Sequence, residues 1–143
     1  VNPDNVTSEL SVIFKLFNLV LGTSYFNPVT LAVAASFANT PSVFRGLKEL
    51  RIKESDRLKL ILLNLQNCGV DCKSKNDDLF INPSQKYEIK KNLIQTDFDH
   101  RIAMAFCVMG TKIGPLEILD SESINTSFPN FKSEFNNLGG NIF

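Results

Sequence analysis

Leu-Arg-Ile-Lys-Glu-Ser-Asp-Arg-Leu, at residues 50–58, is the stretch around which the rest of the chain is organised. Five of its nine residues are charged, and it runs directly into an apolar segment. The apolar side chains at 58, 61, 62 and 65 follow the i, i+3, i+4, i+7 spacing of an amphipathic helix. We therefore predict a helix from about Ser55 to Asn67, with Gly69 beyond its end in the left-handed conformation.

The charges at the start of this helix allow two interpretations. If Lys53 and Arg57 share one helical face, the two cations repel by roughly 0.2–0.5 kcal/mol. A helix opening also favours anions over cations. A bound anion would relieve both costs. Alternatively, the stretch is a solvated turn in which Glu54 and Asp56 neutralise the two cations.

A second charged stretch, residues 96–105, reads Thr-Asp-Phe-Asp-His-Arg-Ile-Ala-Met-Ala. Either Asp97 or Asp99 can serve as the N-cap of the apolar helix that follows. This places His100 and Arg101 in the first turn, where free backbone N–H groups favour an anion. His100 is the single histidine of the sequence, and it is either a structural side chain or part of a site.

The two stretches together resemble one enzyme family. Residues 53–58 followed by residues 99–105 are similar to the C-terminal part of the EPSP synthase (3-phosphoshikimate 1-carboxyvinyltransferase) family. Further similar blocks lie at residues 31–38, 46–51 and 126–129. We assign residues 31–143 to the C-terminal part of an EPSP synthase-like domain. Residues 1–30 stay unassigned, because they are atypical for the family.

The resemblance implies a reaction and a set of residues that carry it. The enolpyruvyl group moves from phosphoenolpyruvate to the 5-hydroxyl of shikimate 3-phosphate and phosphate is released, in the shikimate pathway to chorismate and the aromatic amino acids. No metal or organic cofactor is implied. By the resemblance, Lys53 contacts the substrates and moves protons, and Glu54 transfers a proton at C3. Arg57 and Arg101 bind phosphoenolpyruvate, and His100 is a catalytic residue beside them.

The sequence departs from the family in one functional position. The family carries an aspartate general base shortly before the alanine-rich helix, but five residues before Leu31 the chain has Phe26. The N-terminal domain that supplies most contacts to shikimate 3-phosphate is also absent. The chain is therefore an enzyme fragment, a non-catalytic remnant, or the anion-binding half of a split enzyme. The related transferase that acts on UDP-N-acetylglucosamine is not expected to carry these two motifs.

The predicted elements occur in a repeated order. Gly69 and Gly139 are 139 − 69 = 70 residues apart, and Leu31 and Ile102 are 102 − 31 = 71 apart. These offsets indicate a duplicated α/β unit. The resemblance implies an inside-out barrel domain with helices inside and sheets outside, of which about two units are present. We predict helices at 11–21, 29–38, 102–109 (ended by Gly110) and 129–137 (beginning at Pro129, capped by Ser127), strands at 42–44, 47–52, 70–72, 79–81, 116–119 and 141–143, and a polar loop at 120–126.

Composition excludes several other classes. Lys plus Arg and Asp plus Glu both number 15, which argues against nucleic-acid binding through bulk positive charge. Three cysteines, an odd number, do not suggest a secreted disulfide scaffold, so we expect reduced thiols in a cytoplasmic protein. With one histidine they do not complete a usual zinc set. The apolar run 12–21 contains Lys15 and is too short to span a membrane. The first residue, Val1, and the greater length of the family predict a fragment.

Overall fold

The computed structural model describes residues 16, 19–20, 27–84 and 86–143. Most of the predicted helix 11–21 lies outside the described residues, although residues 16, 19 and 20 are helical. The elements are α2 (Pro28–Ser36), β1 (Ser42–Phe44), the 3₁₀ helix η1 (Leu47–Ile52), α3 (Arg57–Asn67), β2 (Asp71–Lys75), β3 (Asp78–Asn82), β4 (Leu93–Ile94), α4 (His100–Ile113), β5 (Glu117–Ile118), the 3₁₀ helix η2 (Ser121–Thr126) and α5 (Phe131–Asn137).

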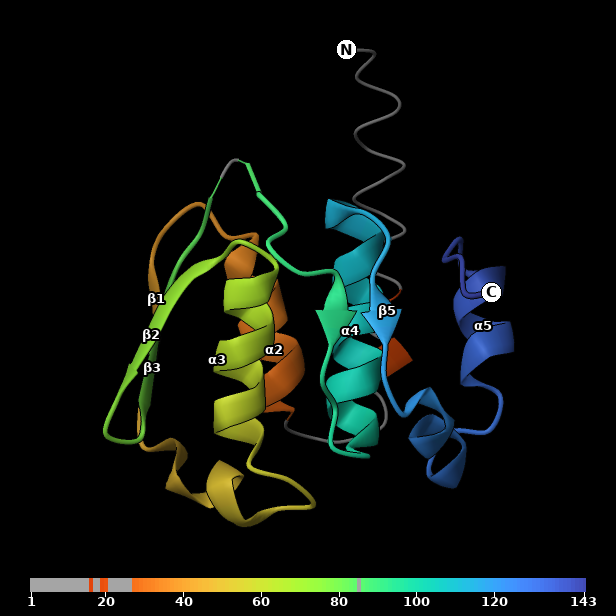
Figure 1. Cartoon of the computed structure of the whole chain (residues 1–143), viewed down its shortest axis with the longest axis horizontal. Helices are drawn as coiled ribbons and strands as arrows, with labels where there is room; N and C mark the ends of the chain where they lie inside the picture. The colour runs from red at the N-terminus through yellow and green to blue at the C-terminus, as the bar shows by residue number, and fades with distance from the viewer. Residues whose placement is uncertain (1–15, 17–18, 21–26, 85) are drawn as a thin grey trace.

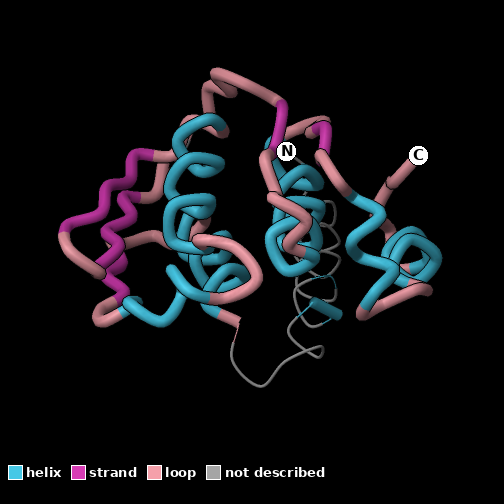
Figure 2. The backbone as a smooth tube through the Cα atoms, turned by 60° about the horizontal axis from the view of Figure 1, so that its bottom comes forward, coloured by secondary structure: helices cyan, strands magenta, loops and turns pink. Residues whose placement is uncertain are grey.

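Helices α2, α3 and α4 stand side by side and begin at the same end of the molecule, the lower end in Figure 1. A sheet of order β1-β3-β2 packs against α2 and α3 from outside, with both pairings antiparallel. Strands β4 and β5 form a parallel pair beside α4. Helix α5 lies on the far side of α4, as the tube in Figure 2 also shows. The helices therefore occupy the interior, and the sheets lie outside them.

Helix α4 links two apolar cores. One core lies between the three-stranded sheet and the helices α2, α3 and α4, and includes the fully buried Ile61, Ile81 and Phe106. The other lies between α4, η2 and α5, and includes Met104 and Phe131. Since α4 contributes side chains to both, its segment 102–109 is buried on almost every side, as the apolar sequence of that segment predicts. Among the described residues, no helix is long and apolar enough to cross a bilayer.

The strand predicted at 47–52 is wrong, because this segment is the 3₁₀ helix η1. Residues three apart share a face in a 3₁₀ helix. Leu47 and Leu50 accordingly pack toward the first core, and Ile52 is 81 % exposed. Leu47 and Leu50 are three residues apart, which fits the period of a 3₁₀ helix and not the two-residue period of a strand.

Four predictions near the C-terminus are also wrong. Helix α4 continues through Gly110 and ends at Gly114, where φ is +120° and a proline follows. Helix α5 begins at Phe131, with Asn130 instead of Ser127 as its N-cap residue. The predicted loop at 120–126 contains η2. Residues 141–143 are not a strand, because the Asn136 side chain binds the backbone of Ile142 at both its N–H and its C=O.

The duplicated unit is confirmed by the order of elements. The series α2, β1, η1, α3 recurs as α4, β5, η2, α5, with 121 − 47 = 74 residues between the starts of the 3₁₀ helices. Gly69 and Gly139 both have positive φ, at 84° and 99°. Equivalent amide side chains also make equivalent contacts: Gln66 donates to the Cys72 carbonyl at 3.0 Å, and Asn136 to the Ile142 carbonyl at 3.1 Å.

Candidate functional site

The site lies where three helices begin. The N-cap side chains are Asn27 for α2, Asp56 for α3 and Asp99 for α4, and each accepts a hydrogen bond from a backbone N–H of its own first turn. Because the three helices begin at one end of the molecule (Figure 1), the positive ends of their dipoles gather there. Free N–H groups and aligned dipoles make such an end favourable for an anion.

The centre of the site is a buried ion pair between α3 and the N-cap of α4. Arg57 is 3 % exposed and Asp99 is 0 % exposed. The Arg57 Nε donates to Asp99 Oδ2 at 2.7 Å, and Nη2 donates to Asp99 Oδ1 at 3.4 Å. Ser55 Oγ donates to the same Oδ2 at 2.8 Å. Asp99 therefore fixes both the start of α4 and the orientation of a guanidinium from the other repeat unit.

The turn before α3 agrees in part with the interpretation in which acidic residues neutralise the cations. Helix α3 begins at Arg57, so Lys53 lies outside it and does not share a helical face with Arg57. Glu54 neutralises Arg57, since Arg57 Nη2 donates to Glu54 Oε2. Asp56 pairs with Arg51 at 3.6 Å, not with Lys53. Lys53 is exposed, and no hydrogen bond or ion pair joins it to another described residue.

His100 and Arg101 occupy the first two positions of α4, as predicted, and both are half-buried. Burial lowers the pKa of His100 from its ordinary value of 6.5. The carboxylates of Asp99 and Glu54 oppose this shift, whereas the nearby guanidinium groups of Arg101 and Arg57 reinforce it. The imidazole is therefore neutral at pH 7, and it can accept or donate a hydrogen bond.

Sequence reasoning missed the partner of Arg57 and the device that positions it. The Asn64 side chain binds the Gln95 backbone on both sides: Nδ2 donates to the carbonyl at 2.7 Å, and Oδ1 accepts from the N–H at 3.0 Å. Asp97 and Phe98 then turn the chain through the left-handed region, at φ 48° and 59°. Each such residue costs roughly 1–2 kcal/mol. The Asn64 side chain thus fixes the backbone at Gln95, and the turn at residues 97–98 follows directly. Together they place Asp99 within hydrogen-bonding distance of Arg57.

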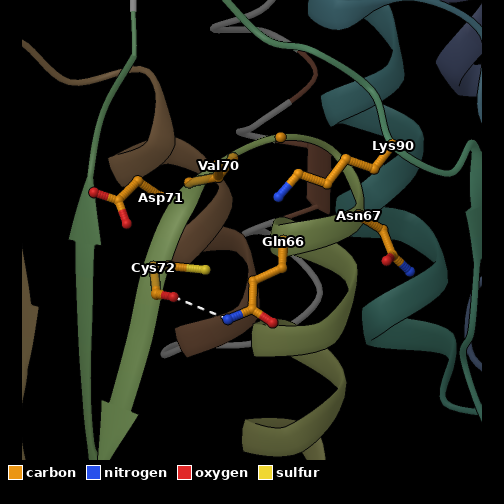
Figure 3. A pocket seen from close by; sticks show the side chains of 7 residues that line it. Gln66, Asn67, Val70, Asp71, Cys72 and Lys90 are labelled. Atoms are coloured by element: carbon orange, nitrogen blue, oxygen red, sulfur yellow. Dashed lines mark hydrogen bonds between the residues drawn. The ribbon is translucent and has the colours of Figure 1, made fainter.

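A pocket elsewhere on the chain is separate from this site. Figure 3 shows it at the C-terminal end of α3, where it is lined by residues that include Gln66, Asp71, Cys72 and Lys90. Burial raises the pKa of the Cys72 thiol to about 12. This thiol is therefore protonated and unreactive near pH 7. The pocket lies at the opposite end of α3 from Arg57 and does not include any predicted site residue.

Comparison with known proteins identifies the family. The family model described as EPSP synthase (3-phosphoshikimate 1-carboxyvinyltransferase) matches residues 3–135. The chain belongs to the EPSP synthase family. The match includes most of residues 1–30, the part that sequence reasoning left unassigned.

Individual EPSP synthases agree with the family match. The chain is 45 % identical over 113 residues to the 3-phosphoshikimate 1-carboxyvinyltransferase of Paramagnetospirillum magneticum, covering 78 % of this chain and 25 % of that protein. It is 44 % identical over 112 residues to the enzyme of Campylobacter jejuni subsp. doylei, with 78 % and 26 % covered. A solved EPSP synthase from Acinetobacter baumannii superposes with a TM-score of 0.71 at 35 % identity, covering 78 % and 26 %. The chain thus spans about a quarter of the length of these relatives.

Acid should weaken this EPSP synthase fold through Asp99. Burial by itself would raise the pKa of Asp99, but hydrogen bonds from Arg57 and Ser55, the charge of Arg57 and the Arg101 N–H hold it below the ordinary 3.8. A carboxyl with a lowered folded pKa stabilises fully above its unfolded pKa, and this contribution disappears as the pH falls through the folded value. We expect the difference in unfolding free energy between wild type and Asp99→Asn to shrink from pH 5 to pH 2, in urea titrations. A constant difference would contradict this linkage.

Proposed function

We propose that this chain supplies the C-terminal part of an enzyme that transfers the enolpyruvyl group from phosphoenolpyruvate to the 5-hydroxyl of shikimate 3-phosphate. The observation that carries the proposal is the Arg57–Asp99 pair at the shared start of α3 and α4. It brings the two family motifs together, although they lie more than 40 residues apart in sequence. A cytoplasmic location, expected from the cysteines, belongs to the same proposal.

The proposed roles follow the chemistry of the reaction. The hydroxyl loses its proton to a base as its oxygen adds to C2 of phosphoenolpyruvate and a proton is added to C3. A proton is then removed from C3 as the C2–O bond to phosphate breaks and phosphate leaves. The guanidinium groups of Arg57 and Arg101 bind the carboxylate and phosphate groups of phosphoenolpyruvate, since a planar fork can make two parallel hydrogen bonds. Lys53 contacts both substrates and moves protons, and Glu54 handles the proton at C3. His100, neutral at pH 7, is the third catalytic residue beside Lys53 and Glu54, and it can accept or donate a hydrogen bond there.

The general base is the missing part of this assignment. The residue five before Leu31 is Phe26, and the following Asn27 is the amide N-cap of α2. Neither side chain can remove a proton from a hydroxyl at neutral pH. These 143 residues span about a quarter of the length of the related enzymes, and a partial site cannot exclude water or hold two reactants in contact. We therefore expect the isolated chain to be inactive, and an anion-binding half of a split enzyme is the second candidate function.

Phosphate release separates these possibilities. The chain is incubated with both substrates, alone and with the remaining portion of the Campylobacter jejuni enzyme produced as a separate polypeptide. Turnover only on mixing would support enolpyruvyl transfer by a split enzyme. Binding of phosphoenolpyruvate without turnover would indicate an anion-binding half. A folded chain that does neither would be a non-catalytic remnant, and the proposal would be rejected.

Where mixing restores turnover, Arg101→Lys should lower kcat/KM by roughly 100-fold, because a point charge replaces a two-pronged donor. The matched control is Arg45→Lys, at an exposed position whose side chain pairs with Asp78 at 3.5 Å on the outer sheet. The control should retain wild-type kinetics. Equal losses in both variants would remove Arg101 from the proposed site.

A further inference from the structure

The two carboxylates that contact Arg57 differ in how firmly they are held. Asp99 is 0 % exposed and accepts hydrogen bonds from Ser55 Oγ, Arg57 and the Arg101 N–H. The Glu54 side chain is 53 % exposed. Within the described part of the chain, its hydrogen bond with Arg57 Nη2 is the one side-chain hydrogen bond that Glu54 makes. Asp99 is therefore a fixed partner, and Glu54 an exchangeable one.

The charges at Arg57 favour an exchange when an anion binds there. One guanidinium and two carboxylates sum to a net charge of −1 above the pH range in which carboxylates titrate. An incoming anion would meet this negative charge at close range, and water partly screens the repulsion because the Glu54 side chain is half exposed. Moving Glu54 into solvent leaves Arg57 and Asp99 as a neutral pair. A ligand carboxylate could then accept from the released Nη2.

We propose that Glu54 occupies the position on Arg57 at which a ligand carboxylate binds, and that Glu54 moves away from Arg57 when the ligand binds. The identity of that ligand as phosphoenolpyruvate rests on the proposed function, but the exchange itself rests on the geometry of Arg57. The exchange links anion binding to proton transfer by Glu54, because a carboxylate that accepts hydrogen bonds in an ion pair is a poor proton acceptor. Glu54 is thus released for proton transfer only when the anion has arrived.

The test compares anion binding by variants of the 143-residue chain. Isothermal titration with phosphoenolpyruvate, and separately with inorganic phosphate, is performed at low ionic strength. Glu54→Gln keeps the size of the side chain but removes the competing charge, so its affinity for phosphoenolpyruvate should rise roughly threefold to fivefold. The matched control is Glu49→Gln on η1, an exposed residue whose substitution changes the net charge equally. The control should bind as the wild type does.

Two results would overturn the inference. One is an affinity of Glu54→Gln that is equal to or below that of Glu49→Gln. The other is no binding by either variant, because removing a competitor would then uncover no anion site. Thermal unfolding of both variants confirms that each is folded, and substitution of an exposed glutamate by glutamine is expected to leave the fold intact.

Kinetics with the supplied second polypeptide distinguish this inference from the proposed function. If both hold, Glu54→Gln lowers KM for phosphoenolpyruvate and also lowers kcat, whereas loss of a simple binding contact would raise KM. If no variant turns over but Glu54→Gln still binds tighter, the exchange stands and the proposed reaction fails. If the wild type turns over and the affinity of Glu54→Gln is unchanged, the exchange fails alone.

Discussion

Replacing Asp99 with alanine is expected to lower the free energy of unfolding by about 3–5 kcal/mol, as removal of one partner from a buried ion pair commonly does. The Arg57 guanidinium, 3 % exposed, would lose the carboxylate that accepts from its Nε. Helix α4 would lose its N-cap at the same time, which costs about 1 kcal/mol. Glu54 still contacts Arg57, so we expect a loss near the lower end of the range. Urea titration at pH 7 measures it.

The control for this prediction is Asp56→Ala. Asp56 is also an N-cap, that of α3, but its side chain is partly exposed and its ion pair with Arg51 is at the surface. Its removal should cost about 1 kcal/mol. Asp99→Asn separates the two roles further, since an amide can cap the helix but cannot neutralise Arg57. If Asp99→Ala costs no more than Asp56→Ala, the buried pair does not stabilise the fold.

Replacing Gly69 with alanine should cost about 3 kcal/mol or more. Its φ of +84° is unfavourable for any residue with a Cβ, by roughly 1–2 kcal/mol. A Cβ built there would also lie 2.4 Å from the Glu88 carbonyl oxygen and 2.8 Å from the Glu88 nitrogen. Because these are backbone atoms, no rotamer change relieves the overlap. The segment that crosses the end of α3, tied to it by the Lys90 N–H bond to the Asn67 carbonyl at 2.8 Å, would have to move.

Gly46→Ala separates the cost of the backbone conformation from the cost of the steric overlap. Gly46 has a similar φ of +69°, but no atom lies within 4 Å of the position that its Cβ would occupy. This variant should therefore lose about 1–2 kcal/mol, from backbone conformation alone. The difference between the two variants in chemical denaturation measures the close approach of the Glu88 backbone. Equal losses of unfolding free energy in the two variants would show that the segment around Glu88 moves away from the new Cβ at no measurable cost.

The helices could be predicted from sequence because their signals are local and strong. The amphipathic spacing from Leu58 to Leu65 lies within α3. The sequence narrows the cap of α4 to Asp97 or Asp99, of which the structure uses Asp99. The type of η1 could not be decided from spacing, since the apolar residues at 47, 50 and 52 are three and then two residues apart and fit neither period throughout. Gly110 is the predicted end of α4, but the helix continues to Ile113, and Gly114, which a proline follows, is its C-cap. A glycine alone is a weaker helix stop than a glycine followed by proline.

The candidate site was predictable only in part. The contact between Glu54 and Arg57 joins residues three apart, and such pairs can be inferred from spacing. The Arg57–Asp99 pair joins residues 42 apart, and only the packing of α3 beside α4 brings them together. Local preference even opposes the path to Asp99, because Phe98 adopts a left-handed conformation that aromatic residues seldom take. Tertiary contacts, among them the Asn64 hydrogen bonds to Gln95, override that preference.

The division of one ion pair between two repeat units has a consequence during synthesis. When the first unit leaves the ribosome, its Arg57 has no buried carboxylate from α4, and burying the guanidinium at that stage is unfavourable. Asp99 follows 42 residues later, which takes about two to eight seconds at typical elongation rates. The first unit is therefore expected to stay loosely packed on the ribosome during this interval. A pause in translation between the two codons would prolong its exposure to proteases and chaperones.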